Sequence, residues 1–259
     1  MSEILRELLQ VSEKAANITQ ACRQQEALFH LLIEEKKEGE KNKKFAVDFR
    51  PWLMCSGKTT ELLSRVLSGN RSAPEALAKV VHRDVAFGDP ALDSVDTSIP
   101  KDILGIWVDP IDSTYRCVKV SADVKANQGI FPCSRQCVTI LICVYDIQTG
   151  VPLMGVINQP TVSQDLNTLR WKGECYWGLS YMRTNIHSLQ PTISKNSSEP
   201  QPASASSEGK SPHPFSAVIS TSEKETIKAV LSWVCGDSTF WAAGAGYKSL
   251  CVVQGLVDV

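Results

Sequence analysis

Two aspartates, Asp109 and Asp112, follow an apolar run at residues 103–108 that is typical of a buried strand. Pro110 fixes its own φ and cannot donate to a sheet ladder, so we expect the chain to leave the sheet there and curl back, bringing the two carboxylates together. Close carboxylates repel each other unless a hard cation lies between them, and oxygen ligands of this kind favour Mg²⁺. The alternative is an ordinary Asp-Pro turn whose second aspartate caps the next helix.

A second candidate site is the small-residue segment 244–248, Gly-Ala-Gly-Tyr-Lys. Small residues at the start of a helix let ligand oxygens reach unpaired backbone N–H groups, and the charge of Lys248 would add to the attraction for an anion. Small residues also allow helices to pack closely, and this alternative stays open on the sequence alone.

The elements that would hold these sites follow from hydrophobic periodicity. Apolar residues recur at helical spacing from Ile4 to about Lys36, with a break expected near residues 17–25 and Gly39 as a stop signal. Apolar segments on either side of the turn 146–150 predict a β-hairpin of residues 138–145 and 151–157, and a further strand is expected at residues 170–178.

The last third of the chain changes in composition. Residues 190–214 are rich in Ser, Pro, Asn, Lys and Glu and bury too little apolar area to order themselves, so we expect a disordered loop. A strand is expected at residues 215–220. Ser222 and Glu225 then stand at the spacing of a capping box, which predicts a helix to about Cys235 that Gly236 ends. The predicted organisation is residues 1–189, with N-terminal helices, an atypical junction at about 50–60 and a β-rich metal-site part; the loop 190–214; and a C-terminal α/β part with the anion site at 215–259.

The composition excludes several classes of function. The 259 residues are 43% hydrophobic and carry a formal charge of −1, so no basic excess points to a nucleic-acid partner. The sequence has no run of about 18 apolar residues for a membrane span and no apolar leader at its N-terminus. Nine cysteines, an odd number, are scattered through apolar stretches, which indicates reduced thiols. We therefore expect a cytoplasmic protein that contacts no membrane.

Residues 56–60, Ser-Gly-Lys-Thr-Thr, end like a phosphate-binding loop. The required first glycine would fall at Trp52, and residues 51–55 do not read as a preceding strand, so the pattern argues against a nucleotide site. A nucleotide enzyme of this type would need labelled ATP to bind in a manner that depends on Lys58.

The segment 109–114 resembles the metal-binding signature of the lithium-sensitive, Mg²⁺-dependent phosphatases of the inositol monophosphatase and fructose-1,6-bisphosphatase superfamily. Within it, four features are similar to the inositol polyphosphate 1-phosphatase branch: Leu-Arg-Glu-Leu-Leu at residues 5–9, the charged run 36–45, Ser113 where relatives often have Gly, and the segment 244–248. The resemblance implies an α+β or α/β fold of the sugar-phosphatase type, with αβαβα layers that are incomplete in this chain.

The resemblance also implies roles for individual residues. Asp109, the Ile111 carbonyl and Asp112 would hold Mg²⁺, with lithium as an inhibitory ion, and Thr114 would help position the attacking water. The inositol phosphate would lie against the residues that match the family's substrate pocket: Asp112, Ser113, Thr114, Ser222, Lys224, Gly244, Ala245 and Lys248. The implied reaction is removal of the 1-phosphate from inositol 1,4-bisphosphate and inositol 1,3,4-trisphosphate by a monomer.

Parts of the family pattern have no match in this sequence. The family completes its metal site with a Gly-Glu-Glu on a strand, an Asp on the preceding helix and a Trp-Asp nearer the C-terminus, and the chain has none of the three. We interpret it as an internally deleted and C-terminally truncated variant. Two hypotheses follow: an inositol phosphatase with an impaired site, or a noncatalytic inositol-phosphate-binding or regulatory isoform. Turnover distinguishes them.

Overall fold

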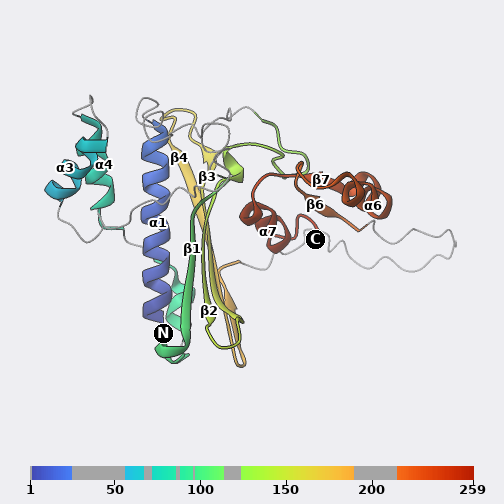
Figure 1. Ribbon diagram of the computed structural model, residues 1–259, viewed down its shortest axis with the longest axis horizontal. Helices are drawn as coiled ribbons and strands as arrows, with labels where there is room; N and C mark the ends of the chain where they lie inside the picture. Colours follow the sequence, from blue (N-terminus) through green and yellow to red (C-terminus); the bar gives the residue numbers. More distant parts are fainter. Residues whose placement is uncertain are drawn as a thin grey trace, which may run out of the picture.

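The computed structural model describes residues 2–24, 56–66, 72–85, 88–95, 97–113, 124–189 and 215–259. Its central feature is an antiparallel sheet of five strands in the order β1-β2-β3-β4-β5. The strands are β1 (Leu104–Asp112), β2 (Thr139–Asp146), β3 (Pro152–Gln164), β4 (Trp171–Tyr181) and β5 (Thr184–His187). Helix α1 (Ser2–Gln24) lies along one face of this sheet, and α3 (Ser56–Val66) and α4 (Ser72–Val81) lie beyond α1 (Figure 1).

The other face of the sheet looks toward the C-terminal part of the chain. Helix α7 (Ala245–Val253) lies between the five-stranded sheet and a small parallel sheet of β6 (Ala217–Ile219) and β7 (Thr239–Trp241), and α6 (Glu225–Cys235) lies beyond the small sheet (Figure 1). Layers of helix and sheet therefore alternate, as an α+β fold of the sugar-phosphatase type requires. No described helix is both long and apolar enough to cross a lipid bilayer.

Two hydrophobic cores among the described residues hold these layers together. In the first, the apolar stripe of α1 packs against the sheet: Leu5, Leu8 and Leu9 meet Ile142, Val144, Val156 and Trp177. In the second, Tyr247 and Cys251 of α7 pack with Phe240, Val218 and the loop residue Ile130. Burial of apolar side chains of this size is worth about 1.5–3 kcal/mol each before the entropy cost of ordering the chain.

Several local predictions are confirmed. The hairpin forms between β2 and β3, with Asp146 accepting backbone N–H bonds in its turn and Gly150 at φ 73°, and β4 covers the further strand. Gly236 ends α6 at φ 54°, a left-handed conformation that glycine adopts readily.

Other local predictions are wrong or lie elsewhere. Helix α1 runs without a break through Asn17 to Gln24, because its buried positions keep one stripe, and the expected stop at Gly39 lies outside the described residues. The capping box is absent: Lys224 precedes α6 with no side-chain hydrogen bond to the helix. The strand after residue 214 is shorter than expected, and the loop 190–214 falls outside the described residues.

The segment that precedes the two aspartates also differs from expectation. Ile106, Trp107 and Val108 are 57%, 52% and 43% exposed, although their apolar run predicted burial. β1 is an edge strand of the sheet, and no other element among the described residues buries these three side chains. Residues 56–60 begin helix α3 rather than a phosphate-binding loop, and Lys58 is exposed in its first turn.

Candidate functional site

The two aspartates lie where β1 departs from regular pairing. Asp109 pairs with Leu141 and Asp112 with Thr139, so three steps along β1 match two along β2. The prediction that Pro110 takes the chain out of the sheet is therefore wrong in detail. The extra residue is absorbed as a bulge and β1 continues to Asp112, and the two carboxylates lie close enough for their charges to interact.

Ser113, directly after the bulge, has φ 64°. A left-handed conformation costs an L-residue roughly 1–2 kcal/mol, whereas glycine adopts it freely. The strain is held in place by the neighbouring chain, because an added Cβ on Gly244 would stand 2.5 Å from the Ser113 Oγ.

The Asp112 carboxylate is fixed by contacts from two other elements. Its Oδ2 accepts the backbone N–H of Gly246, in the first turn of α7, at 2.8 Å, and the Thr139 hydroxyl at 3.3 Å. A carboxylate at a helix N-terminus interacts favourably with the helix dipole. The segment 244–248 thus begins a helix whose N-terminus interacts with a negative charge. In this structure that charge is the Asp112 carboxylate.

Close approach explains why glycines occupy this segment. Gly244 has φ 83°, and a Cβ there would lie 2.9 Å from the Cys137 carbonyl oxygen. A Cβ on Gly246 would lie 2.3 Å from the Thr139 Oγ1 and 2.5 Å from the Leu141 Cδ2, distances that real Cβ atoms do not show. The packing interpretation of the small-residue segment is therefore confirmed, and the helix start also donates one N–H to the chain's own Asp112.

The negative charges of the two aspartates repel each other. Partial burial raises the pKa of Asp109, the negative charge of Asp112 raises it further, and the Ile111 N–H that donates to Asp109 acts in the opposite direction. A cation between the carboxylates would remove this repulsion.

The donor set fits one hard cation. Asp109, Asp112 and the Ile111 carbonyl offer oxygen ligands of the type that Mg²⁺ takes. Within the described part of the chain, no three His, Cys, Asp or Glu side chains gather closely enough to hold a metal. Two carboxylates are thus the side-chain ligands that this site offers. Sites that bind a divalent cation tightly commonly have more ligands from the protein.

The remaining predicted residues are placed as follows. Lys248 is half-buried in the first turn of α7 and its Nζ donates to the Ser220 Oγ at 2.8 Å, in the loop that continues to Ser222 and Lys224. Ser222 and Lys224 are exposed there, and Ala245 is exposed at the start of α7. The structure therefore joins α7 to the 220–224 loop through Lys248. Thr114 lies outside the described residues.

Sequence reasoning did not single out Thr139, and it did not connect Gly246 of the segment 244–248 with Asp112. Thr139 is fully buried as the first residue of β2, and Gly246 is separated from Asp112 by 134 positions. The available signals were weak: a threonine at the start of a strand that faces the aspartate segment, and a second glycine after Gly244.

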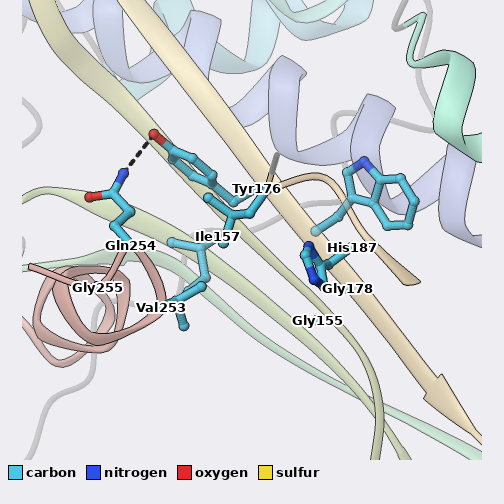
Figure 2. Close-up of a pocket in the computed structure, with 10 residues that line it drawn as sticks. Gly155, Ile157, Tyr176, Gly178, His187, Val253, Gln254 and Gly255 are labelled. Carbon is cyan, nitrogen blue, oxygen red and sulfur yellow. Dashed lines mark hydrogen bonds between the residues drawn. The ribbon is translucent and has the colours of Figure 1, made fainter. Parts of the chain in front are cut away.

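A hollow of about 580 Å³ lies away from the carboxylates, at the C-terminal end of α7 (Figure 2). Gly155 and Gly178 face each other across β3 and β4 in its floor, and Figure 2 shows Gln254 reaching from α7 to the Tyr176 hydroxyl, a 2.8 Å hydrogen bond. The lining is mostly apolar, so the chemistry of this hollow differs from that of the aspartate site.

Comparison with known proteins identifies the family of the chain. The model of the inositol monophosphatase family matches residues 5–259. Inositol polyphosphate 1-phosphatase from Homo sapiens is 64% identical over 304 aligned positions, which include all of this chain and 76% of the human protein. The proteins of the same name from Bos taurus and Mus musculus are 61% and 60% identical, again over all of this chain and 76% of theirs. Because the chain has 259 residues, 45 of the 304 positions in the human comparison lie opposite gaps in it.

Proposed function

The chain belongs to the inositol monophosphatase family, and from this premise we propose that it is a Mg²⁺-dependent phosphomonoesterase with impaired turnover. The substrates we propose are inositol 1,4-bisphosphate and inositol 1,3,4-trisphosphate, from which it removes the 1-phosphate. The relatives of 60–64% identity carry the name inositol polyphosphate 1-phosphatase, which supports this class of substrate.

One observation carries the proposal: Asp109 and Asp112 lie close enough for their charges to interact, and the Gly246 N–H in the first turn of α7 holds Asp112. Asp109, Asp112 and the Ile111 carbonyl would hold Mg²⁺, which when bound supplies an activated water and neutralises the leaving oxygen. Thr114 would orient that water.

The chain's own groups bind and orient the substrate. The N-terminus of α7 and the Lys248 ammonium favour an anion, and Gly244 and Ala245 would line the phosphate site there. Ser113, Ser222 and Lys224 would contact the remaining hydroxyl and phosphate groups. Lys248 is already held by Ser220, so its charge is positioned before substrate arrives.

A second candidate function is a noncatalytic inositol-phosphate-binding or regulatory protein. The observation that favours it is the small ligand set, because in the described residues two carboxylates form the side-chain share of the cation site. Such a site would hold a substrate without activating water efficiently.

Phosphate release from inositol 1,4-bisphosphate with Mg²⁺ tests the proposal. The matched comparison is a longer version of the chain. In it, the residues of the human relative that have no counterpart in this sequence are inserted. We expect slow release that depends on Mg²⁺ and is faster by several orders of magnitude in the restored chain, since one oriented electrostatic group is often worth about 10²- to 10³-fold. Binding of the bisphosphate with no release at all would favour the noncatalytic function. Release at equal rates by both proteins would contradict the impairment.

A further inference from the structure

The Asp112 carboxylate has one oxygen engaged and one oxygen available. Oδ2 accepts both the Gly246 N–H and the Thr139 hydroxyl, whereas Oδ1 accepts no hydrogen bond from any group in the described residues. The two donors come from different elements, α7 and β2, and they converge on the same atom. A carboxylate held in this way cannot rotate freely, so the direction of Oδ1 is fixed as well.

The packing around these donors explains why the arrangement is rigid. Thr139 is fully buried and is the direct partner of Asp112 in the β1–β2 pairing. Gly246 presses so closely on Thr139 and Leu141 that no side chain fits between them. Thr139 is β-branched, which restricts its χ1 rotation. The hydroxyl therefore stays where its donation to Asp112 requires it.

We propose that Thr139 is a positioning residue for the cation site: together with the Gly246 amide it fixes Oδ2 of Asp112, so that Oδ1 faces a divalent cation shared with Asp109. The inference rests on the proposed function only in that the cation is the one that function requires. Partners that orient a metal ligand from outside the metal's own shell typically contribute 10- to 100-fold to metal affinity.

A purely structural role for Thr139 predicts something different. A buried hydroxyl that serves only to satisfy hydrogen bonds would affect stability when it is lost but would leave the affinity for Mg²⁺ unchanged. Thr161 offers a matched control, because it is another buried threonine and its hydroxyl donates to the Arg135 carbonyl, with no contact to Asp112.

The experiment is calorimetric titration of the full chain with MgCl₂ at fixed pH and ionic strength. We expect Thr139→Val, which keeps the shape and removes the hydroxyl, to weaken Mg²⁺ binding about tenfold. Thr139→Ser should restore binding to within about threefold of the original protein, because the hydroxyl is back although its rotation is freer. Thr161→Val should lose stability while keeping its affinity for Mg²⁺.

Each outcome bears on the proposal. Unchanged Mg²⁺ affinity in Thr139→Val, an equal loss in Thr161→Val, or no Mg²⁺ binding by the original protein would overturn it. If Thr139→Val does not fold, Thr139→Cys takes its place, because a thiol fills a similar volume and donates weakly; full affinity in that variant would refute the positioning role. Mg²⁺ binding that depends on Thr139 in a protein that releases no phosphate would refute the proposed turnover alone.

Discussion

Replacing Gly246 by alanine tests how far the site depends on the contact between α7 and β2. The new Cβ would lie 2.3 Å from the Thr139 Oγ1 and 2.5 Å from the Leu141 Cδ2, so α7 or β2 must move. Overpacking of this kind costs about 1–3 kcal/mol. The movement would also break the N–H bond to Asp112, and hydrogen bonds to charged groups are worth about 1.5–3 kcal/mol. Alanine returns about 1 kcal/mol through its higher helix propensity.

The expected net loss in the free energy of unfolding is therefore about 1.5–5 kcal/mol. Gly155→Ala is the matched control, because Gly155 has an ordinary φ and an added Cβ there meets nothing within 4 Å. Its free energy of unfolding should stay within about 0.5 kcal/mol of the original value.

Urea unfolding followed by circular dichroism measures both changes, with the slope of the transition checked for constancy. Mg²⁺ titration of the folded Gly246→Ala protein should show weaker binding as well, since Asp112 loses its fixed orientation. If Gly246→Ala is as stable as Gly155→Ala, the close approach of α7 to β2 is not as the structure shows it. The explanation of the glycine segment by packing would then fail.

Three further predictions concern the charges of the chain. Mg²⁺ should bind at one weak site, because two carboxylates and a carbonyl form it, and calorimetry on an Asp109→Ala, Asp112→Ala double variant should show that site gone; two tight sites would contradict this. Lys248→Ala should weaken inositol 1,4-bisphosphate binding more than Lys224→Ala, because Lys248 is fixed beside the N-terminus of α7 while Lys224 is exposed. Both losses of affinity should become smaller at high salt. Equal affinities in the original protein and the two variants would count against the anion site. Glu13→Gln should stabilise the protein at pH 7 and lose this advantage in acid, which unfolding curves measured across pH would show. Burial raises the pKa of Glu13 above its ordinary 4.5, although the hydrogen bond from Asn158 lowers it in part. The protonated Glu13 side chain therefore contributes fully to stability below pH 4.5, and this contribution is lost as the pH rises through the folded-state pKa. A stability difference that does not change with pH would refute that reading.

Local chemistry made part of the fold predictable from the sequence. The hairpin of β2 and β3 follows from apolar segments around a turn with Asp146 and Gly150, and the end of α6 follows from Gly236. Such signals depend on residues within a few positions of each other. The proximity of Asp109 and Asp112 was predicted for the wrong reason, because β1 stays in the sheet past Pro110 and a bulge, not an exit of the chain, separates the two aspartates.

Burial was predicted less well, because it depends on which elements cover a strand. The run 103–108 has the apolar character of a central strand, yet Ile106, Trp107 and Val108 are exposed on an edge strand. The missing capping box at Ser222 has a similar origin. The spacing of Ser222 and Glu225 permits the box, but the chain enters α6 through an extended Lys224, at φ −62° and ψ 141°, and the helix begins two residues later than the box requires.

The candidate site lies where the two cores of the molecule meet, and this explains why its details could not come from the sequence. Asp112 and Thr139 belong to strands whose far ends pack in the first core with α1, whereas Gly246 belongs to α7, whose Tyr247 and Cys251 lie in the second core. The bond from Gly246 to Asp112 joins the two. Periodicity describes how each core is built from its own segments, but the distance between Asp112 and Gly246 is set by how the cores dock. A change that loosens either core should therefore alter the orientation of Asp112 before it unfolds the strand that carries it.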